Sequence, residues 1–301
     1  MSSSNEKLVV GWIGTGMMGR WMCEHIIPLA SKTVIYNRSV EKTRPLSDAG
    51  AIVVNSPKEV AQQADIIFTI VGHPSDVRDV YFGESGLFSA SRKGCLFVDM
   101  TTTEPSLAIE IEKKALSLGC NAIDAPVSGG DIGAKEARLT IMVGGKESSY
   151  SRALLFFNAM GTATLQGGPG SGQHTKMCNQ IVIAGTMAGV CESLLYARKA
   201  NLDGKILIDT ISKGAAGCWS LQNLAPRIID NNYNPGFMID HFVKDMGIAL
   251  AEAKKMSLSL PSLSLVEQLY VSLQESGQGH LGTQALVLAL DRINDTDLFS
   301  N

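Results

Sequence analysis

The sequence lacks the patterns that usually hold a metal ion or a disulfide framework. Its six cysteines are scattered along 301 residues, with no C-x-x-C pair and no Cys/His cluster at zinc-ligand spacing. Most of them fall in apolar segments, where a free cysteine behaves as a small hydrophobic residue. We therefore expect no metal site and a reducing compartment.

A strong charge of one sign and long apolar runs are also missing. Lys and Arg total 26 against 29 Asp and Glu, which gives no reason to expect nucleic acid or an anionic membrane as partner. The longest apolar runs fall well short of a membrane span. The first seven residues are polar and have no signal-peptide pattern. Together these absences predict a cytoplasmic protein.

Glycine, in contrast, is abundant, with 30 residues, and many of them are clustered. Gly14, Gly16 and Gly19 follow an apolar run and precede a helical pattern. This G-x-G-x-x-G spacing lets the backbone turn tightly, approach a pyrophosphate closely and aim a helix N-terminus at it. The motif predicts a dinucleotide site, and the residues that would contact the cofactor are Gly14, Thr15, Gly16, Met17 and Met18.

The cofactor subtype depends on the end of the second expected strand. An enzyme that uses NAD usually carries a carboxylate about 20 residues beyond the glycines, where it binds the ribose 2′-hydroxyl. Here the strand ends in Asn37, Arg38 and Ser39. Arg38 suits a 2′-phosphate, and its neighbours can hydrogen-bond to the same group. A surface arginine after a strand is also common, but its register with the glycine loop favours NADP(H) over NAD(H).

Apolar patterning divides the chain into two parts. Strand signals lie at 8–13, 33–36, 51–54, 65–71, 95–100, 121–127, 139–143 and 162–165, and helix signals alternate with them. After the glycine cluster at 167–172 only helical spacing remains, at 173–196, 205–212, 221–229, 238–255, 263–275 and 283–290. We therefore expect an α/β Rossmann-type doubly wound domain over 1–166, followed by an all-α domain over 167–301.

Two further motifs carry groups that suit chemistry. Ser128, Gly129 and Gly130 follow an expected strand, and two glycines let backbone N–H groups form a concavity for a substrate carboxylate or carbonyl. A plain tight turn explains the same three residues. Lys176 and Asn179 share one face near the start of a long helix, as a general acid/base and a substrate-orienting amide would. Spacing alone favours a solvated lysine there, and His174 is a rival proton donor.

Four motifs in order give the chain a specific resemblance. The glycine loop, the stretch from Asp124 to Gly130, the pattern from Gly170 to Asn179, and Lys244-Asp245-Met246 resemble the β-hydroxyacid dehydrogenase family over essentially the whole chain. The resemblance implies that Lys176 is the catalytic lysine and that Ser128–Gly130 and Asn179 bind substrate. The cofactor contacts that it implies beyond the glycine loop are Val71, Gly72, Thr102 and Lys244.

The chain departs from the family pattern at two places. Gln180 stands where the family often has a second asparagine, and Val71-Gly72 precedes His73-Pro74 where many members have Leu-Pro. Asn37-Arg38 is similar to the NADPH-using glyoxylate and succinic semialdehyde reductase branch. Trp219, flanked by small residues, would either shape the substrate pocket or lie in the core of the helical domain.

The expected function is hydride transfer between NADP(H) and a small β-hydroxyacid or carboxylate-bearing aldehyde, with Lys176 as general acid/base. One alternative is a catalytically inactive NADP-binding scaffold of the same fold. Another is 6-phosphogluconate dehydrogenase, for which the helical domain looks too short. Apolar helix faces in the second half, and the resemblance, predict a homodimer or homotetramer.

Overall fold

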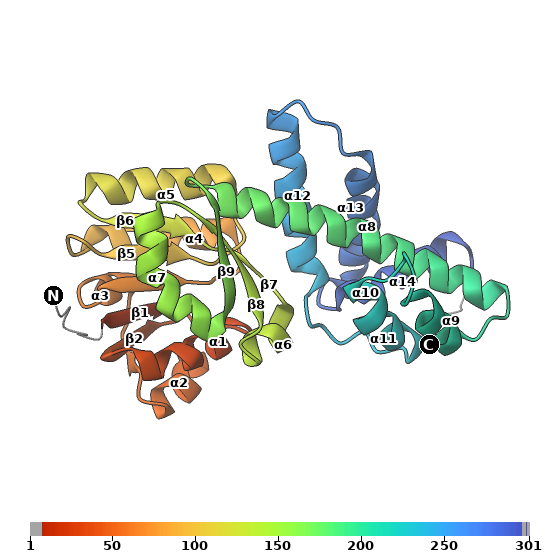
Figure 1. Ribbon diagram of the computed structural model, residues 1–301, viewed down its shortest axis with the longest axis horizontal. Helices are drawn as coiled ribbons and strands as arrows, with labels where there is room; N and C mark the ends of the chain where they lie inside the picture. Colours follow the sequence, from red (N-terminus) through yellow and green to blue (C-terminus); the bar gives the residue numbers. More distant parts are fainter. Residues whose placement is uncertain (1–7, 297–298, 300–301) are drawn as a thin grey trace. The chain divides into compact units, whose positions relative to one another are not determined.

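The computed structural model describes residues 8–296 and 299. The chain divides into two compact units, Met1–Lys176 and Met177–Asn301. The first unit thus extends past the expected boundary at 166/167, because the first turn of the helix that follows is bonded to the sheet through Asp124. The two units follow in the expected order, an α/β unit and then a helical unit (Figure 1).

A nine-stranded sheet forms the centre of the first unit. Its strands are β1 Val9–Ile13, β2 Lys32–Tyr36, β3 Ile52–Val53, β4 Ile66–Thr69, β5 Leu96–Asp99, β6 Asn121–Asp124, β7 Val127–Ser128, β8 Leu139–Gly144 and β9 Gly161–Gly167. They follow the order β3-β2-β1-β4-β5-β6-β8-β7, and β9 also pairs with β8. All pairings are parallel except those of β8 with β6 and β7. The strand order reverses between β1 and β4, where doubly wound sheets bind their ligands.

Helices cover both faces of this sheet, because successive strand residues point to opposite sides. On β4, Phe68 belongs to one hydrophobic cluster and Ile67 to the other. One face packs against α1 Gly19–Ile26, α2 Arg44–Asp48, α6 Gly130–Lys135 and α7 Glu147–Met160. The other packs against α3 Pro57–Ala61, α4 Pro74–Phe82 and α5 Pro105–Ser117. Short 3-10 turns follow at Ile27–Leu29, Val40–Thr43 and Leu87–Ser89.

The expected single strand over 121–127 is wrong in one respect, because it is two strands. Pro126 has no N–H to continue a ladder, and β6 ends at Asp124. The carbonyl oxygen of Pro126 accepts a hydrogen bond from the Met142 N–H at 3.0 Å. The chain then forms β7, which pairs antiparallel with β8 so that Ser128 lies opposite Thr140. This break sets where the Ser128 loop begins.

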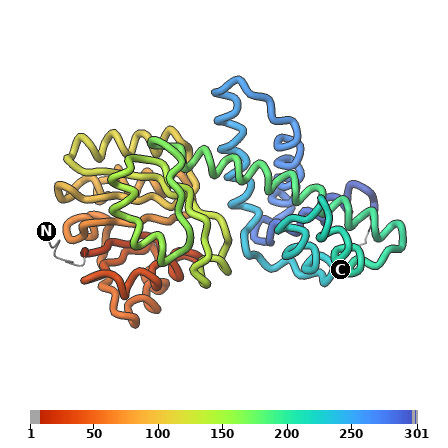
Figure 2. Tube along the Cα trace, viewed as in Figure 1, coloured from red at the N-terminus to blue at the C-terminus, as the bar shows by residue number. Residues whose placement is uncertain are grey.

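The second unit is built of helices (Figure 2). Their buried apolar residues form one hydrophobic core. They are α8 Ser171–Lys199, α9 Gly204–Ile211, α10 Trp219–Asn223, α11 Ala225–Ile229, α12 Ile239–Lys255, α13 Pro261–Leu273 and α14 Leu286–Ile293, with short turns at Gln274–Gln278 and Thr283–Ala285. The helix expected over 221–229 is two short helices, because Pro226 in the first turn of α11 cannot continue the helix before it. Ala184, Met187 and Cys191 of α8 are buried in this core.

Helix α8 is unusual in its length and apolar character. Its 29 residues include an 18-residue window of mean hydropathy 1.3, of which 44% is buried, so by length and composition alone it would also suit a membrane span. A core helix passes the same test, and the buried apolar residues of α8 from Met177 to Leu194 lie in the helical core. The expectation that no apolar run reaches such a length therefore underestimated this helix.

Candidate active site

The glycine loop joins β1 to α1, and its three glycines meet three different surroundings. Gly14 has a φ of +98°, and a Cβ there would lie 1.9 Å from the carbonyl oxygen of Ile70. A Cβ at Gly19 would lie 2.2 Å from the carbonyl oxygen of Gly14, whereas Gly16 faces open space. The first glycine thus makes the turn, the third lets the helix pack closely, and the second leaves room for a ligand against the backbone.

Asn37 links this loop to the end of β2. Its Oδ1 accepts a hydrogen bond from the Thr15 N–H at 2.9 Å, and its Nδ2 donates to the Ser39 carbonyl at 2.8 Å. Asn37 therefore braces the loop, a role that the sequence did not suggest for a residue expected at the 2′-phosphate.

The groups around the loop fit the phosphates of a dinucleotide. A pocket of about 370 Å³ beside it is lined by Thr15, Gly16, Met17, Arg20, Trp21, Glu41, Lys42 and Pro45. Within the part of the chain that the structure describes, Thr15 Oγ1 and Arg20 Nε are buried without a hydrogen-bond partner. Such donors are the groups that phosphate oxygens satisfy, and an open Gly16 lets phosphates approach the backbone. A nicotinamide dinucleotide bound here would supply or accept the hydride.

Arg38 is the cation at the end of β2, and its side chain is 86% exposed. Its Nη1 lies 3.1 Å from Asp76 Oδ1. The other oxygen of Asp76 accepts the His73 N–H at 3.1 Å, so this carboxylate also caps α4. Arg38 thus bridges from the β2 end to the first turn of α4, which follows half-buried Val71 and Gly72.

The Ser128 loop adopts a backbone shape that requires glycine. Gly129 has a φ of +135° and Gly130 a φ of +65°, a region that other residues rarely occupy. Ser128 is half-buried at the end of β7. The loop therefore presents a hydroxyl beside backbone that favours glycine.

Lys176 reaches this same loop from α8. The side chain is buried, with 6% exposed, and its Nζ donates a hydrogen bond to the Val127 carbonyl at 2.8 Å. The two residues are 49 positions apart in sequence. A solvated helix lysine, which spacing alone favoured, is therefore the wrong interpretation. His174, the rival proton donor, is exposed.

Two buried carboxylates lie behind the loops. Asp124 accepts hydrogen bonds from the Gly170 and Gln173 N–H groups, each at 2.8 Å. Asp99 accepts from Thr69 Oγ1 at 2.9 Å and from the Thr101 N–H at 3.1 Å. Burial raises the pKa of each carboxyl to about 6, because desolvation of the charged form outweighs these hydrogen bonds.

In the helical unit, a polar chain connects α8 to α12. Asn179 Nδ2 donates to Gln180 Oε1 at 2.8 Å, and Gln180 Nε2 donates to Asp245 Oδ2 at 2.6 Å. Lys244 Nζ lies 3.1 Å from Asp245 Oδ1, and the lysine side chain is only 14% exposed. Gln180, which replaces the family's second asparagine, thus orients Asn179 and anchors it to α12.

Trp219 stands at the start of α10 and is 63% exposed. The interpretation of Trp219 as part of the helical core is therefore wrong. A large exposed ring beside Cys218 and Ser220 is available to shape a ligand site.

Sequence reasoning gave no role of their own to several buried polar residues. Gln173, Asp99, Thr101 and Asp245 are buried polar residues with hydrogen bonds to the loops or to α12. The sequence carried one usable signal. The glutamine between Gly172 and Lys176 stands four residues before Met177, in line with the apolar positions of the expected helix. Within residues 8–296 and 299, no group of three or more His, Cys, Asp or Glu is arranged to hold a metal ion.

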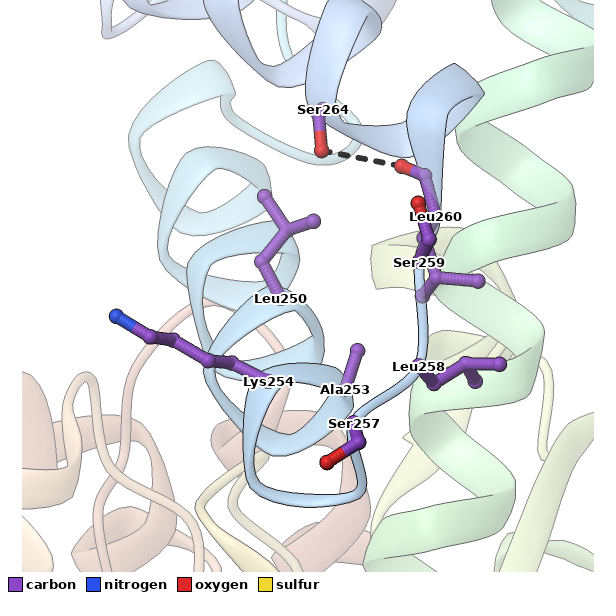
Figure 3. Close-up of a pocket in the computed structure, with 8 residues that line it drawn as sticks. All are labelled: Leu250, Ala253, Lys254, Ser257, Leu258, Ser259, Leu260 and Ser264. Carbon is purple, nitrogen blue, oxygen red and sulfur yellow. Dashed lines mark hydrogen bonds between the residues drawn. The ribbon is translucent and has the colours of Figure 1, made fainter.

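A larger pocket, of about 520 Å³, lies where α12 ends and α13 begins (Figure 3). It is lined by Leu250, Ala253, Lys254, Ser257, Leu258, Ser259, Leu260 and Ser264. Ser264 Oγ donates to the Leu260 carbonyl at 3.0 Å, so this hydroxyl serves α13 itself. Lys254 is the single charged side chain in this lining, which gives no reason to place the chemistry here despite the size.

Family comparisons match both halves of the chain. Residues 9–168 match the model described as the NAD binding domain of 6-phosphogluconate dehydrogenase. Residues 170–290 match the model described as NAD-binding of NADP-dependent 3-hydroxyisobutyrate dehydrogenase.

Named relatives extend over nearly the full length. A probable 3-hydroxyisobutyrate dehydrogenase-like 1, mitochondrial, of Arabidopsis thaliana is 50% identical over 100% of this chain and 90% of its own. The 2-hydroxy-3-oxopropionate reductase of Escherichia coli is 36% identical over 94% and 97%. A solved structure of Mycobacterium tuberculosis 3-hydroxyisobutyrate dehydrogenase with L-serine is similar at a TM-score of 0.86, with 27% identity over 94% of this chain and 99% of that one.

Proposed function

The chain belongs to the β-hydroxyacid dehydrogenase family, and we propose that within it this protein is an NADP(H)-dependent enzyme whose proton donor is Lys176. Membership of this family identifies the protein as an NAD(P)-dependent hydroxyacid dehydrogenase. The choice of NADP(H), the role of Lys176 and the class of substrate are the proposal.

One observation carries the role of Lys176. Its buried ammonium donates to the Val127 carbonyl and so stands next to Ser128, whose loop has two successive positive-φ glycines, a backbone suited to an anion concavity. A proton donor beside a group that holds the substrate carboxylate is what reduction of a neighbouring carbonyl requires.

Each residue of the site has a separate role in the proposed reaction. Ser128 and the Gly129 and Gly130 backbone bind the substrate carboxylate and orient the carbonyl. During reduction the carbonyl carbon receives a hydride, and the Lys176 ammonium gives its proton to the carbonyl oxygen. In the reverse direction neutral Lys176 takes the hydroxyl proton while the hydride leaves carbon. Asn179, oriented by Gln180, helps to align the substrate.

The preference for NADP(H) is supported by the end of β2. No carboxylate follows Tyr36 there, and exposed Arg38 is a planar cation that suits a 2′-phosphate. Arg38 would exchange its contact with Asp76 for the phosphate, or share it. Thr102, Lys244 and Trp219 keep their proposed roles, the first two toward the cofactor and the third toward substrate.

The substrate that we propose is a small carboxylate-bearing aldehyde or the matching β-hydroxyacid. A 6-phosphogluconate dehydrogenase is a weaker candidate, because the second half matches a 3-hydroxyisobutyrate dehydrogenase model and the named relatives act on small hydroxyacids or their oxo forms.

We further propose a homodimer or homotetramer in the cytoplasm. Val182 and Tyr196 leave large apolar area exposed on α8, at 64% and 76%, and a second copy of the chain would bury it. Six free thiols suit a reducing compartment. Light scattering of the purified protein tests the assembly, and cell fractionation tests the location.

The function itself is tested by following NADPH oxidation with four carbonyl compounds: tartronate semialdehyde, glyoxylate, succinic semialdehyde and the aldehyde of 3-hydroxyisobutyrate. Repeating each assay with NADH gives the cofactor preference, and 6-phosphogluconate with NADP⁺ tests the weaker candidate. We expect turnover with at least one aldehyde and a higher kcat/KM with NADPH. Higher kcat/KM with NADH, or turnover with 6-phosphogluconate alone, would contradict the proposal.

A further inference from the structure

Gln173 is a polar side chain buried completely in the first turn of α8. Both ends of its amide bond to the backbone of one loop, residues 101–103, which follows β5. Gln173 Oε1 accepts the Thr103 N–H at 3.0 Å, and Gln173 Nε2 donates to the Thr101 carbonyl at 2.8 Å. Two bonds from one planar group fix the distance and the orientation of that loop relative to α8.

The same loop is held from its other side by residues expected near the cofactor. Thr101 Oγ1 accepts the Val71 N–H at 3.0 Å, and the Thr101 N–H donates to Asp99 Oδ1 at 3.1 Å. Thr102, the expected cofactor contact, stands between the two residues that Gln173 binds. The loop is therefore hydrogen-bonded to the residues after β4 and at the end of β5 on one side, and to α8 on the other.

On α8, Gln173 is also tied to the strand that leads to the substrate loop. Its N–H donates to Asp124 Oδ2, and Asp124 is buried at the end of β6. Lys176 follows one turn later on the same helix side, where its Nζ reaches the Val127 carbonyl. Gln173 thus stands between the loop with the expected cofactor contact and the proposed proton donor.

We propose that Gln173 is a positioning residue for hydride transfer, whose side-chain amide holds the loop 101–103 and Lys176 at a fixed spacing. This inference rests on the proposed function, because it takes Lys176 as the proton donor. Gln173 contacts neither the substrate nor the reacting atoms. It acts by keeping two groups that do so in register with each other.

A loss of this register lowers the rate of chemistry more than the affinity for cofactor. The glycine loop and Arg38 bind the cofactor independently of Gln173, so NADPH affinity changes little when the amide is removed. Misplacement of a reacting group by about 1 Å costs on the order of 10²-fold in rate. A merely structural glutamine would instead reduce the fraction of folded protein and leave the folded molecules fully active.

The test replaces Gln173 with methionine, which has a similar length and volume but no amide. The matched control is Gln284→Met, because Gln284 is also buried and donates to two backbone carbonyls, of Asn232 and Asn234. NADPH titration counts the binding-competent sites and gives Kd. Turnover per site is measured with the most active of the four aldehydes, using NADPH and NADPH carrying deuterium at both C4 positions of the nicotinamide.

For Gln173→Met we expect kcat per site to fall about 10²-fold, Kd for NADPH to change far less, and the deuterium isotope effect on kcat to rise as hydride transfer becomes rate-limiting. Gln284→Met should keep the wild-type turnover per site and isotope effect. Gln173→Asn is polar but too short to bond both ends of the loop, so it should show the same loss of kcat per site. It takes the place of Gln173→Met if the methionine variant does not fold.

Two outcomes separate this inference from the proposed function. Retained turnover in Lys176→Met overturns the assignment of the proton donor, and the inference with it. Lost turnover in Lys176→Met together with a wild-type turnover per site and isotope effect in both Gln173 variants overturns the inference alone.

Discussion

Asp99 and Asp124 occupy paired positions on the neighbouring parallel strands β5 and β6, and both carboxyl groups are buried. Asp99 accepts a hydrogen bond from the Thr101 N–H in the loop after β5. Asp124 accepts hydrogen bonds from the N–H groups of Gly170 and Gln173 at the start of α8. Two ionisable groups therefore support the loops from beneath, and each has its pKa raised to about 6 by burial.

This arrangement predicts a pH-dependent stability. The ordinary pKa of an aspartate side chain is 3.8, and burial in the folded state raises the pKa of Asp99 above it. Stability from the protonated form is therefore fully present below that value and is lost as the pH rises through about 6. Between pH 4 and pH 7 the free energy of unfolding of Asp99→Asn should therefore rise by about 2.4 kcal/mol relative to that of the wild type. Urea unfolding at several pH values measures this, and a pH-independent difference would contradict the raised pKa.

Lys176→Met removes the proposed proton donor while keeping an apolar chain of similar length. We expect kcat to fall by about 10²–10⁴-fold, because that is the usual contribution of a positioned general acid. The Kd for NADPH should stay near its wild-type value. Lys199→Met, an exposed lysine at the other end of the same helix, is the control and should keep normal turnover. Equal activity of the two variants would exclude Lys176 as the acid.

Arg38→Ala should shift cofactor preference. Loss of a charge-assisted hydrogen bond costs about 1.5–3 kcal/mol, so KM for NADPH should rise about 10- to 100-fold. KM for NADH should change little, since NADH has no 2′-phosphate. Arg78→Ala removes another exposed, ion-paired arginine and should affect neither cofactor. If both KM values rise together in Arg38→Ala, Arg38 does not distinguish the two cofactors.

The glycines of the loop should respond differently to one added methyl group. Gly14→Ala should destabilise the fold, because its Cβ would meet the Ile70 carbonyl at 1.9 Å and its φ is +98°. Gly16→Ala should keep the melting temperature near that of the wild type, because nothing lies within 4 Å of its Cβ. Its effect should appear as weaker NADPH binding in a fluorescence titration. A stable Gly14→Ala, or undiminished NADPH affinity in Gly16→Ala, would contradict these roles.

Local patterns predicted the elements with strong signals and failed where a single proline redirected the chain. The sequence Ser56-Pro57-Lys58-Glu59 is a helix-start signal, and Ser56 does cap α3, with its Oγ accepting the Glu59 N–H at 3.3 Å. The breaks at Pro126 and Pro226 were missed, because apolar residues continue on both sides of each proline and hide it.

The candidate site was predictable where a motif carried it and not where the fold alone creates it. The sequence identified Gly14, Ser128 and Lys176 as separate motifs, and the family resemblance assigned their roles. The contact between Lys176 and Val127 depends on a separation of 49 residues, which no local pattern encodes. The brace from Asn37 to Thr15 and the clamp made by Gln173 were missed for the same reason.

Lys176 and Met177 are consecutive residues of one continuous helix, yet they belong to different compact units. Most chains change units in a loop, where an inserted residue does little harm. Here a residue inserted or deleted between Lys176 and Asn179 would rotate Asn179 by about 100° about the axis of this helix, away from the side of the helix that carries Lys176. Helical units exchanged between relatives must therefore be joined in phase, with the number of residues across the junction unchanged.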